Sequence, residues 1–196
     1  MSQAEQEWGQ WARYGARGMR GGEALARELD RIVQSRGIAS PVTTKRGLNA
    51  RLKYLDSEAG REALYEAGVK PRTLRDWRKG RSTPSRASRE KIDAAYWSRR
   101  RQNLLQSGWL KKHLSNSGRG TQVEIYPVDQ SRVPAQHQRP NVQERTIRVR
   151  YVWDDAVDAW EAGDFDQLSD IWTDVIADLD SDWVAYAYVS GIGIGA

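Results

Sequence analysis

The segment KPRTLRDWRK, residues 70–79, carries the side chains best suited to chemistry in this chain, because they could bind an anionic polymer and read its bases. Arg72 can donate two parallel hydrogen bonds to a guanine, and neighbouring lysine and threonine side chains can reach bases or phosphates. Arg75 and Arg78 are suited to a phosphate backbone, since the planar guanidinium matches two phosphate oxygens. The side chains expected to face outward are those of Lys70, Arg72, Thr73, Asp76 and Lys79. Together with Arg75 and Arg78 they make up the residues of this segment that are expected to contact DNA.

Catalytic side chains give a weaker signal. Asp154, Asp155 and Asp158 are close enough in sequence to hold a magnesium ion, as nuclease carboxylates do. Asp154 and Asp155 also fall at an expected helix start, where the helix dipole favours negative charge, and we favour this structural role. The chain has no cysteine and two histidines, which excludes thiol nucleophiles, cysteine-ligated zinc and multi-histidine sites. We therefore expect no enzyme active site, no metal and no cofactor.

A helix-turn-helix over residues 58–79 would position the basic side chains. Its first helix ends at Gly68, whose backbone freedom suits a tight turn, and Pro71 fits the first turn of the second helix. Lys70 stands where a capping Ser or Thr is usual, so we expect no side-chain cap there. The residues expected to pack inward are Val69, Leu74 and Trp77. In such motifs the second helix enters the major groove, and the alternative is a helical hairpin with a solvated basic face.

Further helices are predicted from apolar residues at helical spacing. They are expected over residues 23–36, 48–55 and 89–114. Arg99, Arg100 and Arg101 follow one another in the last of these, and such a run suits a helix that lies against a DNA backbone. Residues 23–114 are thus expected to form a helical DNA-binding domain. Residues 1–22 are rich in Gly and Arg without a sustained apolar period, and we expect a flexible arm.

Alternating apolar residues predict three strands in the rest of the chain. Residues 122–128 are expected at a sheet edge, because Pro127 cannot donate to a ladder. The segment RTIRVRYVW is a second strand, and the residues expected on one side of it are Ile147, Val149, Tyr151 and Trp153. Acidic helices over residues 154–162 and 166–179 lead to a third strand over residues 183–189. The expected fold is α+β: a strand and loop over residues 115–146 and an acidic β-α-α-β unit over residues 147–196 follow the helical domain.

Charge is divided unequally along the chain. Residues 1–150 hold all 31 Lys and Arg and 15 of the 26 Asp and Glu, whereas residues 151–196 hold 11 acidic residues and no Lys or Arg. Residues 70–112 carry 14 basic and 3 acidic side chains, which is typical of a phosphate-binding surface. The alternative is that the acidic segment folds back on the basic one. The first residues are polar and no run is apolar enough to cross a bilayer, so we expect a cytoplasmic protein at the nucleoid.

The order of these parts resembles the telomere terminal proteins of linear Streptomyces chromosomes and plasmids. The segments that carry the resemblance are LDRIVQ from Leu29, LNARLKYL from Leu48, GVKPRTLRDW from Gly68 and DAWEAG from Asp158. The resemblance implies binding to a single-stranded 3′ overhang at a replicon end, with a telomere-associated protein and a DNA polymerase as partners. It also implies that a hydroxyl side chain becomes covalently joined to the first deoxynucleotide and primes synthesis by phosphoryl transfer.

The accepting hydroxyl of that family aligns with residues 140–143, which contain no hydroxyl in this chain. Thr146 is the first candidate acceptor and Ser131 the second, with Thr121 and Tyr126 nearby. The main alternative is a helix-turn-helix transcriptional regulator, which needs no nucleophile and could form a homodimer through residues 147–196. A magnesium nuclease built on the aspartates is the least favoured alternative.

Overall fold

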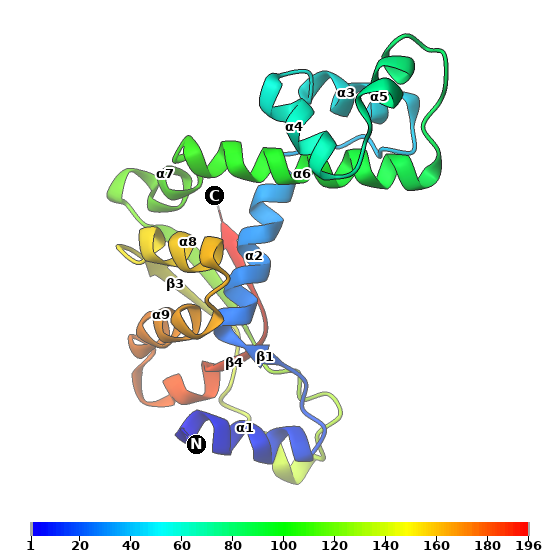
Figure 1. The fold of residues 1–196 in the computed structure, drawn as a ribbon. Coiled ribbons are helices and arrows are strands. Elements are labelled where there is room, and N and C mark those ends of the chain that lie inside the picture. Colours follow the sequence, from blue (N-terminus) through cyan, green and yellow to red (C-terminus); the bar gives the residue numbers. More distant parts are fainter. Residues whose placement is uncertain (1, 196) are drawn as a thin grey trace. The chain divides into compact units, whose positions relative to one another are not determined.

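The computed structural model describes residues 2–195, which form helices and an antiparallel sheet in two compact units (Figure 1). The helical unit comprises residues 33–109, and the sheet unit comprises residues 2–32 together with residues 110–195. The predicted α+β class is confirmed, as is the order of a helical region followed by a sheet with helices. The expected boundaries differ from the observed ones, because residues 2–32 belong with the C-terminal part of the chain.

Hydroxyl side chains mark where most helices of the helical unit begin. Besides the end of α2 (Gly21–Ser35), this unit contains α3 (Lys45–Tyr54), α4 (Glu58–Glu66), α5 (Pro71–Arg78) and α6 (Arg86–Gln106). The N-cap side chains that accept a first-turn backbone N–H are Thr44 for α3, Ser57 for α4 and Ser85 for α6. Each such cap contributes about 1 kcal/mol, so the sequence itself fixes where these helices begin.

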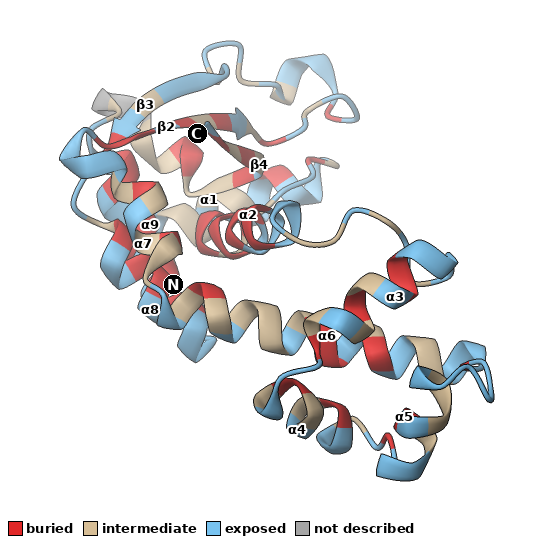
Figure 2. Ribbon diagram, turned by 90° about the horizontal axis from the view of Figure 1, so that it is seen from above, coloured by how far each residue is buried: buried red, intermediate tan, exposed pale blue. Residues whose placement is uncertain are grey.

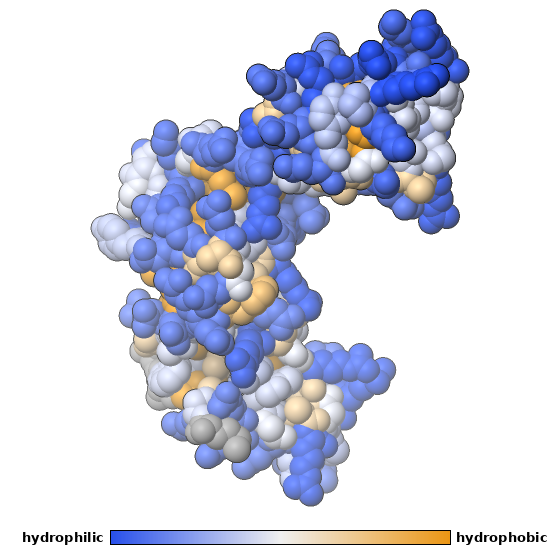
Figure 3. All heavy atoms as spheres, in the orientation of Figure 1, coloured by the Kyte–Doolittle hydropathy of each residue, from blue (hydrophilic) through white to orange (hydrophobic). Residues whose placement is uncertain are grey.

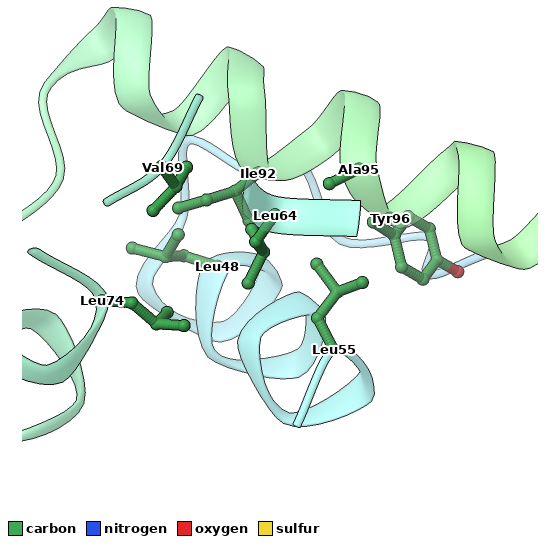
Figure 4. Close-up of a cluster of buried hydrophobic side chains, with 8 residues drawn as sticks. All are labelled: Leu48, Leu55, Leu64, Val69, Leu74, Ile92, Ala95 and Tyr96. Atoms are coloured by element: carbon green, nitrogen blue, oxygen red, sulfur yellow. The ribbon is translucent and has the colours of Figure 1, made fainter. Parts of the chain in front are cut away.

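Apolar side chains from α3, α4, α5 and α6 meet in the core of the helical unit (Figure 4). The buried members are Leu48, Leu55, Leu64, Val69, Leu74, Ile92, Ala95 and Tyr96. Val69 and Leu74 are buried and Trp77 packs against them half-buried, which confirms the inward side predicted for α5. Full burial of a leucine or valine side chain contributes about 1.5–3 kcal/mol, so this cluster fixes α5 against α4 and α6.

The turn between α4 and α5 has the geometry expected from its sequence. Gly68 has φ +79°, a left-handed conformation that other residues adopt only at a cost. The backbone N–H of Gly68 donates to the Tyr65 carbonyl, and that of Val69 donates to the Leu64 carbonyl. Pro71 occupies the first turn of α5, and Lys70 precedes it without a side-chain cap, as predicted.

A buried arginine holds the loop before α3 against α6. The Arg51 side chain is 5% exposed, and its Nε donates to Asp93 Oδ1 over 2.5 Å. Its Nη1 donates to the Ser40 and Gly47 carbonyls over 2.7 and 3.2 Å. The charge is therefore fully engaged inside the unit, where it plays a structural role rather than binding a partner.

The arginine-rich helix is shorter than predicted. Instead of one helix over residues 89–114, α6 ends at Gln106 and α7 (Trp109–Ser115) begins a new one. Gly108 between them has φ +63°, which an α-helix cannot accommodate. The apolar spacing continues across the break, and for that reason periodicity alone did not reveal it.

The sheet unit is built on four antiparallel strands, counted over the described residues, in the order β1-β4-β2-β3. The strands are β1 (Met19–Arg20), β2 (Thr121–Pro127), β3 (Arg145–Val149) and β4 (Tyr188–Gly195). The helices of this unit are α1 (Gln3–Arg13), most of α2, α7, α8 (Trp153–Ala162) and α9 (Phe165–Ala177), with 3-10 turns at Asn116–Gly118, Ala135–His137 and Asp180–Tyr186. In Figure 1, α8 and α9 lie on the same side of the strands.

The two sides of the sheet differ in burial. Along β2, Val123 and Ile125 are buried, whereas Gln122 and Tyr126 are exposed and Glu124 is half-buried. Along β4, Ile192 and Ile194 are buried and alternate with glycines. Helix α2, with many buried residues (red in Figure 2), contributes the Glu28 carboxylate, which accepts the Ile194 backbone N–H over 2.9 Å. This contact satisfies a donor of β4 beyond its short pairing with β1.

Three predictions about strands are wrong. β2 pairs with both β3 and β4 and is therefore not an edge strand; Pro127 is tolerated because it lies at the end of β2, where the register shifts. β3 ends at Val149, since Tyr151 has φ +64° and Trp153 starts α8. The third strand is not residues 183–189: the 3-10 turn ends at Tyr186, and the glycine-rich tail forms β4 instead.

The prediction of a flexible arm over residues 1–22 is also wrong. Residues 3–13 form α1, which starts with a capping box in which Ser2 and Glu5 bond each other's backbone N–H. Trp11 is 5% exposed, and the Arg139 guanidinium lies over its ring, with the guanidinium carbon 4.4 Å from the ring centre. Trp8 stacks on Tyr188 and Tyr14 on His137. These contacts are with residues more than a hundred positions away, so local periodicity could not predict them.

Candidate nucleic-acid interface

Basic side chains form a row along the exposed side of α5. Arg72, Arg75 and Lys79 are exposed, and positions three and four apart lie on one side of a helix. The buried Leu74 lies on the opposite side. Within residues 2–195, no hydrogen bond or ion pair engages the side chains of Arg72, Arg75, Lys79 or the exposed Lys70. These four cations are therefore available to an anionic ligand.

Three other predicted contact residues already have partners or are partly covered. Arg78 Nη2 lies 2.7 Å from Asp56 Oδ1, so that its charge is compensated within the unit. Asp76 is half-buried, and its Oδ1 lies 3.7 Å from Arg81 Nη1. Thr73 is half-buried at the side of the row. The structure thus brings all seven predicted residues of 70–79 together on or beside α5, but it leaves only four of them with unpaired charge.

The start of α5 adds a further feature suited to anions. Lys70 precedes the helix, Pro71 opens it, and no side chain caps it. The first-turn N–H groups of a helix carry partial positive charge, and phosphate groups commonly bind there. Residues 70–75 therefore combine helix N–H groups with the side chains of Lys70, Arg72 and Arg75.

Arg99, Arg100 and Arg101 lie in the second half of α6, whereas α5 is joined to its first turn. Arg100 Nη2 donates to the Arg36 carbonyl over 2.8 Å, and its guanidinium lies 5.9 Å from the Tyr54 ring centre. Arg99 Nη1 donates to Gln102 Oε1 over 3.3 Å. The Nε atoms of Arg99 and Arg100 are buried without a hydrogen-bond partner in the described chain. Arg100 thus contributes to the packing of α6 against the end of α2, and the run does not extend the row on α5.

Sequence reasoning missed the residues that neutralise some of these arginines. Asp56 pairs with both Arg78 and Arg61, and Glu90 pairs with Arg86. The seven acidic residues among the eighteen basic ones of residues 33–109 are a signal that some arginines have partners. The Arg86–Glu90 pair is four positions apart within α6 and follows from helical spacing, whereas the pairing of Arg78 with Asp56 depends on how α5 packs and is not visible in the sequence.

The candidate acceptor hydroxyls lie in the sheet unit. Thr146 is exposed on β3, and Ser131 is exposed in the loop after β2. The Ser131 backbone N–H donates to Asp129 Oδ1 over 2.8 Å, and hydrogen bonds from the backbone and side chain of Ser131 lower the pKa of Asp129. Thr121 is buried and donates to the Leu114 carbonyl. The Tyr126 hydroxyl donates to Glu124, which raises the pKa of Tyr126. Thr146 and Ser131 are accordingly the accessible aliphatic hydroxyls of this set.

The aspartates at the start of α8 do not converge. Asp158 forms an ion pair with Lys111, with Oδ1 2.6 Å from Nζ, and the hydrogen bond raises the pKa of Lys111. Asp154 and Asp155 stand in the first turn of α8, as their structural interpretation predicted. Among the side chains that the structure describes, no three of His, Cys, Asp or Glu are close enough to share a metal ion.

Comparisons with protein-family models, curated proteins and solved structures found no match to this chain. None of the helices in the described part of the chain is long and apolar enough to span a membrane.

Proposed function

We propose that this protein binds duplex DNA by placing α5 in the major groove. The observation that carries the proposal is the row of unpaired cations on the second helix of a helix-turn-helix. The inward side of the same helix is fixed by Val69 and Leu74, so the row is presented on a rigid element. In helix-turn-helix proteins the N-terminal residues of this helix contact base edges.

The charge of the helical unit supports the same proposal. Residues 33–109 contain 18 Lys and Arg and 7 Asp and Glu, a formal net charge of +11. In Figure 3, hydrophilic side chains cover most of the visible surface of this unit. Each phosphate that a cation neutralises releases condensed counterions, so binding is expected to weaken steeply with salt. Within the row, we assign base contact to Arg72 and phosphate contacts to Lys70, Arg75 and Lys79.

The resemblance to terminal proteins extends the proposal to a role at the ends of a linear replicon. In that role an accessible hydroxyl oxygen attacks the α-phosphate of a deoxynucleoside triphosphate, pyrophosphate leaves, and the hydroxyl proton passes to a base. The exposed hydroxyls of Thr146 and Ser131 are the candidate nucleophiles. A DNA polymerase with its metals would supply the phosphoryl-transfer machinery, and a telomere-associated protein would be a further partner.

The DNA-binding proposal is tested by selecting bound duplexes from a random pool with the full-length chain. We expect one enriched motif. At one base position of that motif, Arg72→Ala should lose about 1–3 kcal/mol of discrimination. Lys79→Ala should weaken binding to all sequences alike. No enrichment, or an Arg72→Ala variant that weakens all sequences equally, would contradict the assignment of α5 as the reading helix.

The replicon-end role is tested by the mass of the protein purified from its own host under denaturing conditions and treated with nuclease. A residual nucleotide on the peptide that contains Thr146 or Ser131 would support this role and identify the acceptor. An unmodified mass, together with a palindromic selected site whose half-sites lie about one helical turn apart, would favour a dimeric transcriptional regulator instead.

A further inference from the structure

We propose that the outer edge of β3 binds an extended acidic peptide, which adds to the sheet as a further strand. Within the described residues, β3 pairs with β2 and with no other strand. Toward the opposite edge of the sheet, β4 is covered, because β1 pairs with it and the Glu28 carboxylate of α2 accepts its Ile194 backbone N–H. An uncovered strand edge presents unpaired backbone N–H and C=O groups, and extended peptides bind to such edges.

Charge on and beside β3 specifies an acidic partner. Arg148 and Arg150 are exposed, and they lie two positions apart, as side chains on one side of an extended strand do. Among the described residues, the Arg150 side chain forms no hydrogen bond or ion pair, and the Arg148 side chain forms only a long hydrogen bond of 3.4 Å to the Gly120 carbonyl. Acidic residues opposite these arginines would form cross-strand pairs. Acidic side chains near β3 are Glu144, which precedes the strand, Glu124, which lies on β2 opposite Thr146, and Asp154, which lines a pocket with Arg150. Among the described residues, none of them forms an ion pair with Arg148 or Arg150.

The core-facing side of β3 determines which residues of the peptide should alternate with the acidic ones. Ile147 is half-buried and Val149 is buried, so this side of the strand belongs to the core. Arg145 on the same side is anchored, with its Nε donating to the buried Tyr186 hydroxyl over 3.1 Å. A side chain opposite Ile147 would therefore be apolar. The expected ligand is a segment in which acidic and apolar residues alternate.

A preformed pocket lies where β3 ends. Its volume is about 190 Å³, and its lining includes Gly120, Arg150, Tyr151 and Trp153. Tyr151 is 87% exposed and has φ +64°, a conformation that costs energy for a residue with a side chain. Asn116 and Ser117, which stand between the lining residues Ser115 and Gly118 in the sequence, also have positive φ. Strained backbone of this kind is concentrated at binding sites, and the pocket can receive the terminal apolar side chain of the added strand.

Two other occupants fit the edge less well. A second copy of this chain would bring two arginine-bearing strands together, and like charges on neighbouring strands repel. A nucleic acid could neutralise Arg148 and Arg150, but it would leave the backbone groups of β3 unpaired. The acidic peptide satisfies both the charges and the backbone.

Fluorescence anisotropy with the full-length chain tests the proposal. The probe is a labelled eight-residue peptide that alternates glutamate and valine. The comparison probes alternate lysine and valine, or keep the glutamates and replace the valines by proline. We expect binding of the glutamate–valine peptide alone, because the lysine peptide has the wrong charge and the proline peptide lacks half of the N–H donors.

Charge reversal then locates the binding site. Arg148→Glu with Arg150→Glu should weaken binding of the glutamate–valine peptide about tenfold, from the loss and reversal of two cross-strand pairs. The matched control, Arg13→Glu with Lys112→Glu, makes the same change in net charge at exposed positions elsewhere in the sheet unit and should leave binding unchanged. Because the peptide comparison uses the unmodified protein, it decides the question even if a variant fails to fold.

Three results would overturn the proposal. Equal binding of the proline peptide would mean that the β3 backbone takes no part. Failure of the glutamate–valine peptide, with a sedimenting dimer that the Arg148→Glu, Arg150→Glu variant disrupts, would assign the edge to a second copy of the chain. Failure of the peptide, with weaker binding of DNA by that same variant, would assign the arginines to phosphate contacts.

Discussion

The helical unit and the sheet unit carry opposite net charge and are stabilised in different ways. Residues 33–109 have a formal charge of +11, whereas the remaining residues hold 13 Lys and Arg and 19 Asp and Glu, a formal charge of −6. The helical unit is assembled from neighbouring segments with local caps and a leucine-rich core. The sheet unit instead joins residues 2–32 to residues 110–195. The proposed binding surfaces differ accordingly: a basic row on a helix, and a basic strand edge in an otherwise acidic unit.

The two structural units do not coincide with the basic and acidic parts of the sequence. The break at residue 150 is a break in charge but not in structure, because β3, which ends at Val149, pairs with β2 beside β4. Arg148 and Arg150 therefore belong to the same unit as the eleven acidic residues that follow them. An acidic unit can thus present a local basic site.

The largest expected effect comes from deleting residues 151–196. The deletion removes β4, which lies between β1 and β2, together with α8 and α9. We expect the sheet unit to unfold completely while the helical unit keeps its core, since no member of that core lies after Tyr96. Circular dichroism and hydrogen exchange of the truncated chain would measure this. Loss of exchange protection in residues 45–106 would contradict the independence of the two units.

A pair of core substitutions sharpens the comparison. Trp172→Ala should destabilise the sheet unit by about 3–5 kcal/mol, and Leu64→Ala should destabilise the helical unit by about 2–5 kcal/mol. Trp172 is 2% exposed and its Nε1 also donates to the Tyr186 carbonyl over 2.8 Å, while Leu64 is fully buried. Residue-resolved hydrogen exchange should show each loss in its own unit. A loss that spreads equally over both units would mean that they unfold as one.

A smaller effect is expected at the turn of the helix-turn-helix. Gly68→Ala places a side chain at φ +79° and should cost about 1–2 kcal/mol of stability in the helical unit. The added Cβ would meet only the flexible end of Lys91, so backbone conformation rather than a clash sets the cost. Gly9→Ala, inside α1 with open space around it, is the control and should not destabilise. Thermal unfolding of both variants would measure the difference, and equal melting temperatures would contradict it.

The smallest effect concerns the start of the sheet unit. The pKa of Glu5 lies below its ordinary value, chiefly because the Ser2 backbone N–H donates to its carboxylate, with a further contribution from Arg20. A lowered pKa in the folded state means that the carboxylate stabilises α1 above its unfolded-state pKa, and that this contribution is lost as the pH falls through the folded-state value. An NMR titration of the Glu5 carboxyl should give a pKa below that of the same residue in the urea-unfolded chain. Identical values would contradict the capping box.

The sequence predicted local features well and distant ones poorly. Gly68, Pro71 and the burial of Leu74 follow from turn chemistry and helical spacing, and α4, α5, α8 and α9 lie within a few residues of their predicted positions. The glycine-rich tail was not predicted as a strand because Gly191, Gly193 and Gly195 have low strand propensity, and pairing with β2 overrides it. Likewise, α1 is held by Arg139 and Tyr188, which local patterns cannot reveal.

The candidate site was predictable in position but not in detail. Helical spacing placed Arg72 and Lys79 on the outward side of α5, where the structure has them, and Arg75 is exposed beside them. It could not show that Arg78 pairs with Asp56, nor that Arg100 bonds the Arg36 carbonyl, because both contacts depend on how helices pack. The basic edge of β3 was likewise hidden, since edge and interior strands look alike until the strand order is known.

A matched charge swap tests the central claim most directly. Arg72→Glu with Arg75→Glu, in the full-length protein, should lower affinity for duplex DNA by at least about two orders of magnitude at moderate salt and flatten the salt dependence. Arg13→Glu with Lys112→Glu changes the net charge equally but lies in the sheet unit, and should alter affinity little. Anisotropy titrations of both folded variants across a salt series would measure their affinities for duplex DNA. Equal losses in the two variants would mean that overall charge attracts the DNA, and would contradict the claim that α5 binds it.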